Sequence, residues 1–316
     1  MRVIFDTDIG IDDALALLFL QASPLASLEA ITTTFGNASV EATTRNALYV
    51  CETFGIHVPV HAGVATPLGE TPLTGYADFV HGKNGLGDIP ITAPSTIAST
   101  VPAAQAIVDL VTANPGEISI VAVGRLTNVA MALALEPRLP ELTKQLVVMG
   151  GAFGFNGHTG NVSPVAEANI AGDPLAADIV FGAGFCLTIA GLDVTQEVIM
   201  DESYFQALRE GSRAGQFIYD VSRFYLQFHK NTTGVFACPV HDSSAVAYFV
   251  APELFVTQPA RVRVATSGVA AGQTIQTDPD KSWALPHWSS VSVSNICIDV
   301  DATRFLSLFQ ETLEQI

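Results

Sequence analysis

Residues 1–21 of the chain read MRVIFDTDIGIDDALALLFLQ. The apolar run Val3–Phe5 predicts a short buried strand, and the apolar pattern of Ala14–Gln21 predicts a helix. Between them four aspartates fall within eight residues, and no Lys or Arg follows until Arg45. A strand, an acidic loop and a helix in this order predict the first unit of an α/β fold with dense negative charge beyond its first strand.

The first two-thirds of the chain continue this alternation of short β-branched runs and helical patterns. The predicted strands are Val3–Phe5, Leu28–Thr33, Val58–His61, Ile118–Val123, Gln145–Met149 and Cys186–Ala190. The helical patterns between them are Ala14–Gln21, Val40–Phe54, Ala103–Ala113, Asn128–Leu135 and Pro174–Phe181. Apolar strands separated by helices predict a mostly parallel central sheet flanked by helices on both faces, as in Rossmann-like α/β folds.

The last third has longer helical patterns. Asp201–Lys230 predicts one or two helices and Asp242–Val250 another, followed by strand-like runs at Arg261–Thr266 and Val291–Val300 and a terminal helix from Ala302. No repeat, low-complexity segment or Pro/Ser-rich linker divides the chain. We therefore expect a single domain over residues 1–316 with helical insertions.

The overall composition limits the function classes. The chain is 49% hydrophobic and 14% charged, with mean hydropathy +0.38, which predicts a large buried core. No apolar run reaches the roughly 20 residues that span a bilayer, and Asp6 interrupts any signal-peptide pattern, so a cytoplasmic location is expected. A net charge of −17 disfavours binding to nucleic acid or anionic membranes. The four cysteines form no CxxC pair and are expected to be reduced and packed.

Polar and glycine residues follow several of the predicted strands. Asp6 and Asp8 follow the first strand, Gly36 and Asn37 the second, and the segments 124–128 and 150–160 two later ones. In α/β sheets, ligands bind beyond the carboxyl ends of the parallel strands. This edge of the sheet is therefore the predicted site.

The aspartate cluster itself indicates a cation. Helix capping before Ala14 explains one carboxylate, which would meet the positive end of a helix dipole. It does not explain four, because packed carboxylates raise one another's pKa values unless a positive charge intervenes. Carboxylate oxygens suit Ca²⁺ or Mg²⁺, so the cluster predicts a divalent-cation site.

Two other acidic-loop patterns fit less well. Counted from Asp6, an EF-hand loop needs an oxygen ligand at its fifth position and Glu at its twelfth, where this chain has Gly10 and Leu17. A phosphatase of the haloacid dehalogenase type also begins with a strand and D-x-D. Its usual Thr or Val two residues after the second Asp is Gly10 here, and its lysine and later acidic pair are not obvious. This phosphatase stays open as the alternative enzyme.

Further motifs follow the aspartate cluster in a fixed order. They are TTTFGN (Thr32–Asn37), HGKNGLG (His81–Gly87), VGRLTNVA (Val123–Ala130), GNVSPVAEANIAGDPLAA (Gly160–Ala177) and VHDSSAVAY (Val240–Tyr248). Together with DTDIGIDDALAL they resemble the nucleoside hydrolases, the inosine–uridine-preferring family, from the first strand to about residue 250. The resemblance implies the nucleoside hydrolase fold and an enzyme that hydrolyses the N-glycosidic bond of a ribonucleoside to a free base and ribose.

The resemblance also implies roles for the acidic residues. Asp8 would be a metal ligand and the general base that takes a proton from the attacking water. Asp13, Asp242 and the backbone carbonyl of Thr127 would be further ligands, a set that suits Ca²⁺. Asp12 would accept hydrogen bonds from the ribose diol. Asp6 would support the loop without binding the metal.

Other polar residues fit the two ends of a nucleoside. Contacts to the ribose are expected from Asn37, Asn161, Glu167 and Asn169, the last three lying in a segment predicted as extended or irregular. His241 would protonate the departing base, and His81 is a second candidate on the base side.

The remaining histidines have weaker predictions. His57, His61, His158, His229 and His287 are expected to be surface or structural residues, although His229 and Tyr225 on a helical stretch could also cover the base.

The chain departs from the family pattern at several positions. Arg125 stands where the family usually has Pro, Ala168 where an aromatic residue is common, and Asn84 where Asp is common; the basic residue usual before G-x-T in the tail is also missing at 270–274. None of these changes removes a proposed ligand. The small Ala168 could open the pocket near the 5′ side of the sugar, so the departures bear on substrate preference.

A protein that binds nucleosides or sugars without hydrolysis is the alternative that lacks catalysis. It would need the ribose contacts but not the pairing of Asp8 with a metal-bound water. The expected partners are a small-molecule ribonucleoside of the inosine or uridine type and a second copy of the chain, in a homodimer or homotetramer.

Overall fold

The structure is a computed structural model, and it describes residues 1–69, 75–288 and 290–316. Within these ranges nine strands form the central sheet in the order β10-β9-β11-β6-β5-β4-β1-β2-β3. Their bounds are β1 Arg2–Thr7, β2 Ser27–Thr33, β3 Val60–Ala62, β4 Ile118–Ala122, β5 Gln145–Met149, β6 Leu187–Ala190, β9 Phe255–Val264, β10 Thr274–Thr277 and β11 Val293–Val300. From β3 through β6 to β11 every neighbouring pair is parallel, whereas β9 runs antiparallel to β10 and β11. The predicted mostly parallel sheet is confirmed.

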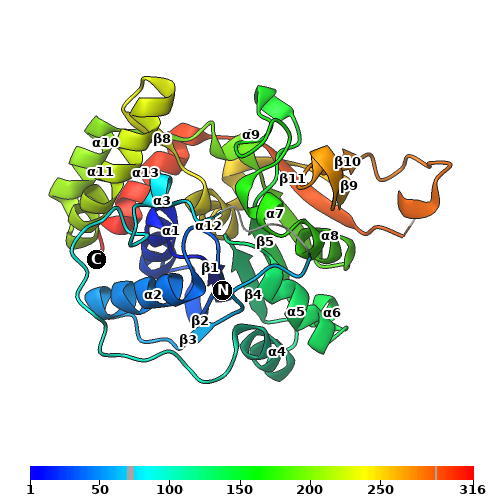
Figure 1. The fold of residues 1–316 in the computed structure, drawn as a ribbon, viewed down its shortest axis with the longest axis horizontal. Coiled ribbons are helices and arrows are strands. Elements are labelled where there is room, and N and C mark those ends of the chain that lie inside the picture. The colour runs from blue at the N-terminus through cyan, green and yellow to red at the C-terminus, as the bar shows by residue number, and fades with distance from the viewer. Residues whose placement is uncertain (70–74, 289) are drawn as a thin grey trace.

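Helices cover both faces of this sheet (Figure 1). Their bounds are α1 Ile11–Ala22, α2 Val40–Phe54, α3 Asp78–His81, α4 Ala103–Ala113, α5 Thr127–Leu135, α6 Leu139–Leu142, α7 Ala168–Gly172, α8 Pro174–Gly182, α9 Leu192–Thr195, α10 Glu202–Gly211, α11 Arg213–Thr233, α12 Asp242–Val250 and α13 Ala302–Leu313. A two-stranded sheet, β7 Ile199–Asp201 with β8 Ala237–Pro239, lies apart from the central one. None of the helices in the described ranges is both long and apolar enough to cross a bilayer.

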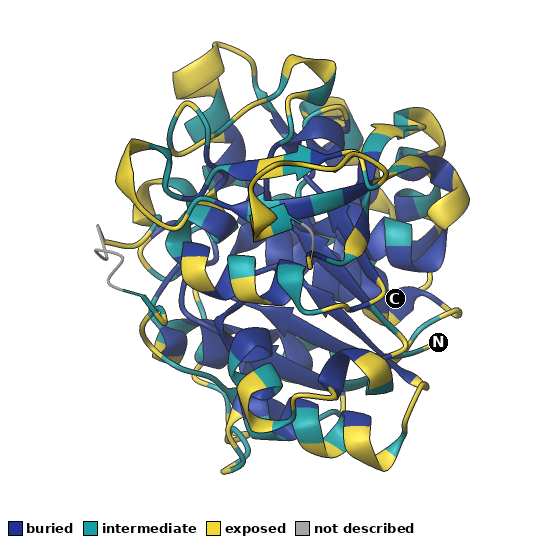
Figure 2. Ribbon diagram, turned by 90° about the vertical axis from the view of Figure 1, so that its right-hand side faces the viewer, coloured by how far each residue is buried: buried dark blue, intermediate teal, exposed yellow. Residues whose placement is uncertain are grey.

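The strands are apolar on both sides because both sides are covered. Val3 and Phe5 of β1 belong to a core that includes α1 and α10–α13, whereas Ile4 between them belongs to a second core with α4, α5 and α8. Figure 2 shows the resulting buried strands at the centre and exposed residues at the periphery.

Helix α1 lies deep in the molecule. Every residue of α1 except Gln21 is buried. On its inner side it packs against α12, and Phe19 contacts Phe309 of α13 with ring centroids 5.0 Å apart. The aspartates at the start of α1 are therefore carried into the protein interior, at the carboxyl end of β1.

The order of the strands places the site. Strand β1 pairs with β2 on one side and with β4 on the other, so the chain leaves β1 toward β2 and β3 and returns to the opposite side at β4. At such a reversal the loops after the two strands turn away from each other and leave a crevice at the carboxyl ends of the strands. The loops after β1, β2 and β4 carry Asp8, Asn37 and Arg125.

Several predicted boundaries are corrected. Asp6 lies within β1 rather than after it, and α1 begins at Ile11, so Asp12 and Asp13 lie in its first turn. Asp201–Lys230 forms two helices, α10 and α11, separated at Ser212, whose hydroxyl caps the second. The predicted strand Arg261–Thr266 overlaps the end of β9, which runs from Phe255 to Val264 and includes Pro259, a residue uncommon in strands.

The cysteines differ from one another in exposure. Cys51, Cys238 and Cys297 are buried and Cys186 is exposed, and all four are free thiols. The prediction of packed thiols is therefore correct for three of them and wrong for Cys186. Burial raises the pKa of the Cys51 thiol to about 12.

Candidate active site

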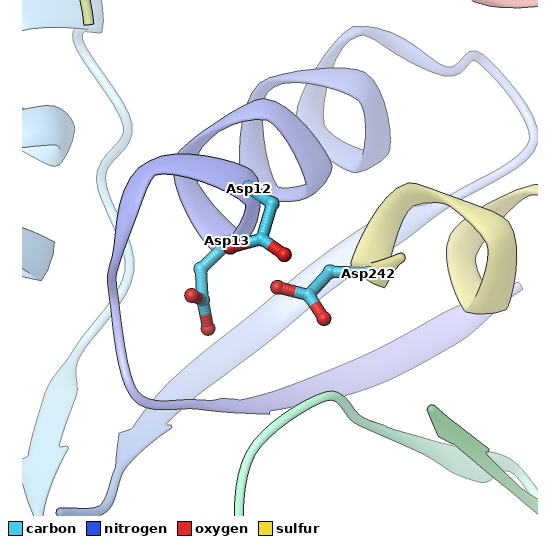
Figure 3. Close-up of side chains that lie close together, drawn as sticks. All are labelled: Asp12, Asp13 and Asp242. Atoms are coloured by element: carbon cyan, nitrogen blue, oxygen red, sulfur yellow. The ribbon is translucent and has the colours of Figure 1, made fainter. Parts of the chain in front are cut away.

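Three carboxylates meet at the amino ends of two helices. Asp12 and Asp13 lie in the first turn of α1 and Asp242 is the first residue of α12; one oxygen of each lies within 4.8 Å of the others (Figure 3). Helix amino ends carry partial positive charge, which offsets part of the repulsion between these groups. The packing of α1 against α12 thus brings Asp13 close to Asp242, 229 residues later in the chain (242 − 13).

Asp13 is held in place by four donors. The Thr7 hydroxyl donates to its Oδ1 at 2.6 Å, and the N–H of Asp8 does so at 3.1 Å. Its Oδ2 accepts from the N–H of Gly10 at 2.8 Å and from the Asn37 side chain at 2.8 Å. These bonds hold the carboxylate in one orientation. The Thr7 contact was not predicted, although Thr7 stands between the two aspartates of D-T-D.

Asp8 has one oxygen bound and one free. Its Oδ2 accepts from the N–H of Asn37 at 2.7 Å, whereas its buried Oδ1 has no partner among the described residues. Gly36 and Gly124 make room for this carboxylate, since a Cβ would lie 1.9 Å from its Oδ2 at the first position and 2.7 Å from its Oδ1 at the second. Burial, and then the charge of Asp13, raise the pKa of Asp8 well above its usual range.

The donor set fits a hard divalent cation. The Oδ1 atoms of Asp8 and Asp12 are buried without a hydrogen-bond partner in the part of the chain that the structure describes, and that of Asp12 lies 3.9 Å from His81 Nδ1. Burial raises the pKa of Asp12 to about 8, and burial together with the charges of Asp12 and Asp13 raises that of Asp242. Unpaired buried carboxylate oxygens are costly, and a cation bound by oxygen would satisfy them. The trio within 4.8 Å contains Asp12, which the sequence assigned to the ribose, and does not include Asp8.

Asp6 and Thr127 have structural partners. Asp6 Oδ1 accepts from the Thr32 hydroxyl at 2.6 Å and from the Asn128 amide at 2.8 Å, tying β1 to β2 and α5. Burial raises the pKa of Asp6 to about 6, while these two bonds lower it. The Thr127 hydroxyl donates to Asp173 at 2.7 Å, and its carbonyl as a metal ligand stays a prediction.

A cavity of about 240 Å³ lies over the carboxylates. Eight of the residues proposed from the sequence line it: Asp12, Asn37, His81, Asn161, Glu167, Asn169, His241 and Asp242. Asp8 lines an adjoining cavity of about 220 Å³. The structure therefore brings the proposed ribose and base residues together with Asp8 and Asp242, whereas the proposed ligands Asp13 and Thr127 line neither cavity.

The ribose candidates after β5 are arranged differently from the prediction. Glu167 caps α7 by accepting from the N–H groups of Asn169 at 2.9 Å and Ile170 at 3.1 Å, and also from Gly151 at 3.0 Å. Asn169 lies in that helix, and its amide donates to the Val123 carbonyl at 2.7 Å. The predicted extended or irregular conformation is thus wrong for Asn169, because the Glu167 cap begins a helical turn. Asn161 lies in an exposed loop.

Histidines gather at one end of the larger cavity. The Nδ1 atom of His81 accepts from the N–H of Ile11 at 3.1 Å, and its ring stacks on Tyr225. His241 pairs with the Thr195 hydroxyl at 2.7 Å. Burial lowers the pKa of His81 to about 4 and that of His241 to about 3, so both rings are neutral at pH 7 in this arrangement.

Helix α11 supplies further residues at this end. Tyr225, Phe228 and His229 line the cavity and follow the i, i+3, i+4 spacing of one helix face. The Nε2 atom of His229 is buried without a partner among the described residues. His229 therefore belongs to the cavity, not to the surface histidines. Phe79, Met149 and Gln196 also line the cavity and were not identified from the sequence, where nothing in their spacing marked them.

Comparisons with known proteins agree with this arrangement. Residues 3–307 match the family described as inosine-uridine preferring nucleoside hydrolase. The probable uridine nucleosidase 1 of Oryza sativa subsp. japonica is 38% identical over 316 residues, which cover 99% of this chain and 96% of that protein. A solved plant nucleoside hydrolase has a TM-score of 0.95 at 36% identity, covering 99% of this chain and 98% of that one. A purine-preferring ribonucleoside hydrolase from Gardnerella vaginalis has a TM-score of 0.91 at 32% identity, covering 99% and 98%.

Proposed function

The chain belongs to the inosine–uridine-preferring nucleoside hydrolases, and from this we propose that it hydrolyses ribonucleosides at a Ca²⁺ site built from Asp8, Asp13, Asp242 and the Thr127 carbonyl. The family membership makes the protein an N-ribosyl hydrolase and sets aside the phosphatase alternative. The observation that carries the proposal is the meeting of buried carboxylates with unpartnered oxygens at the floor of a cavity lined by ribose- and base-binding candidates.

The ribose would lie on the carboxylates. Asp12 accepts hydrogen bonds from the sugar diol, and Asn37, Asn161, Glu167 and Asn169 contribute amide and carboxylate contacts around the ring. Asn37 has a second task, because it donates to Asp13 through its side chain and to Asp8 through its N–H. Asn37 thus holds Asp8 and Asp13 in place beside the ribose that it is proposed to contact.

Asp8 would act as the general base. Its Oδ2 is held by Asn37 while its Oδ1 has no partner in the described ranges, so this oxygen is available to take a proton from the attacking water. When bound, Ca²⁺ would lower the pKa of that water and neutralise the surrounding carboxylates. The water oxygen would add to C1′ as its proton passes to Asp8 and the bond to the base nitrogen breaks, through an oxocarbenium-like state that the nearby carboxylates stabilise.

The base would lie among the histidines and aromatic rings. His241 would donate a proton to the departing base, and its bond to Thr195 orients the ring for this. Because the ring is neutral at pH 7 in this structure, it would have to take up that proton when the substrate binds. His81 is the second donor candidate, held by Ile11 and by Tyr225. The rings that line this part of the cavity suit a planar base of either size, and we propose uridine and inosine as substrates.

The test is ribose release from inosine, uridine, cytidine, adenosine and guanosine, with EDTA and after Ca²⁺ is restored. We expect hydrolysis of uridine and inosine that EDTA abolishes and Ca²⁺ restores. Asp8→Asn should lower turnover by at least about 10³-fold. Asp178→Asn, a partly buried acid in α8 paired with Arg263, is the matched control and should stay near wild type.

Two results would contradict the proposal. Ribose release that survives exhaustive chelation would exclude the metal, and metal-replete protein that binds uridine without releasing ribose would make it a binding protein. Calorimetric titration with Ca²⁺ separates loss of metal binding from loss of the base in Asp8→Asn. Dimer or tetramer assembly and a cytoplasmic location stay predictions from the sequence.

A further inference from the structure

Arg125 is a charged side chain without a hydrogen-bond partner among the residues that the structure describes. It lies in the loop between β4 and α5, and its guanidinium group stacks over the Phe35 ring at 4.5 Å. Gly172 makes room for it, since a Cβ there would lie 2.1 Å from the Arg125 Nε. No residue in the described ranges accepts a hydrogen bond from it, and its Nη1 is fully enclosed.

The acids nearby do not pair with Arg125. The charges of Asp8, Asp173 and Glu167 act on it and partly offset the effect of burial. None of them forms an ion pair with it within 4.0 Å in the described part of the chain, whereas Arg263 forms one with Asp178 at 2.7 Å. A guanidinium group has five N–H donors in a planar fork, and enclosing them without acceptors is unfavourable. This fork matches phosphate and carboxylate groups.

Arg125 lines the smaller cavity, which adjoins the larger one. The cavities meet along the six residues that line both, which are Asn37, Ala77, Phe79, Val162, Ala168 and Asn169. Ala168 contributes only a methyl group at this junction. Arg125 and Asp8 line only the smaller cavity, and His81 and His241 only the larger one.

The two cavities would hold a nucleoside in one orientation. The inference below rests on the proposed function. With the base among the histidines and the diol on the carboxylates, the C5′ end of the ribose points away from the histidines. It then faces the junction at Ala168 and the smaller cavity with Arg125.

We propose that Arg125 forms an anion subsite that accepts a phosphate at C5′, so that ribonucleoside 5′-monophosphates are substrates. The reaction is the same: water adds to C1′, the C1′–N bond breaks, and its electron pair stays on the base, which takes up a proton. The products are the free base and ribose 5-phosphate, and the phosphate ester is unchanged. The net charge of −17 works against an anionic substrate at long range, so the subsite must supply its attraction locally.

The experiment compares phosphorylated with unphosphorylated ligands on the Ca²⁺-loaded enzyme. Calorimetry measures binding of ribose 5-phosphate and of ribose, and kinetics measures kcat/KM for UMP and for uridine. Wild type should bind ribose 5-phosphate at least about tenfold more tightly than ribose and should hydrolyse UMP. Arg125→Met, which keeps an unbranched, flexible side chain but removes the charge and the N–H donors, should remove most of that tenfold preference and lower the UMP-to-uridine ratio of kcat/KM by a similar factor.

A second variant changes the junction between the two cavities and leaves the charge of Arg125 in place. Ala168→Phe fills the junction and should lower the UMP-to-uridine ratio while Arg125 is intact. Thermal unfolding and Ca²⁺ titration of both variants check that each is folded and still binds the metal; if Arg125→Met does not fold, Ala168→Phe and the wild-type comparison of the two sugars decide.

Three results would overturn the inference. The first is a wild-type enzyme that hydrolyses uridine but binds ribose 5-phosphate and ribose equally tightly. Another is UMP that is not hydrolysed. The third is an Arg125→Met enzyme that loses uridine and UMP hydrolysis equally, which would make Arg125 a counter-charge to Asp8. If wild type releases no ribose from uridine, the proposed function has failed, and the calorimetric comparison still decides whether the anion subsite exists.

Discussion

Gly36→Ala should disable the enzyme by moving Asp8. A Cβ at position 36 would lie 1.9 Å from Asp8 Oδ2 and 2.7 Å from its Cγ. Gly36 has no left-handed backbone conformation, so the substitution acts through space alone and not through backbone strain. The Asp8 side chain is buried and Gly124 closes its other side, so it cannot simply rotate away.

The size of the effect follows from these distances. Non-bonded heavy atoms need about 3 Å or more, so the carboxylate or the loop must shift by roughly 1 Å, and the 2.7 Å bond from the Asn37 N–H is strained or lost. A misplacement of about 1 Å in a catalytic group costs on the order of 10²-fold in rate. Overpacking at a buried position should also lower the free energy of unfolding by about 1–3 kcal/mol.

The assay measures kcat/KM for uridine and the Kd for Ca²⁺, with urea unfolding of the same samples. Gly182→Ala at the end of α8 is the matched control, because a Cβ there meets nothing within 4 Å. We expect about a hundredfold loss for Gly36→Ala, with weaker Ca²⁺ binding, and no loss for the control. A Gly36→Ala enzyme within threefold of wild type and with unchanged Ca²⁺ affinity would refute the geometry assigned to Asp8.

Three other contacts lead to predictions of smaller effects on stability. Asn128→Ala removes one of the two donors to buried Asp6 and should lower the free energy of unfolding by about 1–3 kcal/mol in urea titrations; an unchanged midpoint would contradict this. Arg263→Met breaks the two-bond pair with Asp178, both bonds at 2.7 Å, that attaches β9 to α8, and should cost about 1 kcal/mol by the same measurement. A threonine hydroxyl and backbone N–H groups lower the pKa of Glu52 from 4.5 to about 2. The ionised Glu52 therefore stabilises the folded state fully above about pH 4.5, and this stabilisation is lost as the pH falls toward 2. Glu52→Gln should therefore be less stable than wild type at pH 7, and the difference should shrink at pH 3; a difference independent of pH would contradict it.

The sequence was most informative where residues are close along the chain. The apolar strands, the helices between them and the acidic loop followed from local pattern, because a strand buried on both faces needs a continuous apolar run and a helix needs its own spacing. Boundaries were less well predicted. The reason at α1 is that Asp13 caps the helix from within its first turn, so the helix begins three residues before its apolar stretch.

By itself, then, the sequence determined the class of fold, the family through its ordered motifs, and the residue types that a cation and a ribose would require. Only the tertiary structure decided which of them meet. The packing of α1 on α12 puts Asp242 beside Asp12 and Asp13, and the reversal of strand order at β1 puts Asp8 and Arg125 in the lining of the same smaller cavity. Proximity of that kind is set by how the helices and strands pack, since residues remote in sequence become neighbours only when the core between them closes, and no local pattern encodes the distance between them.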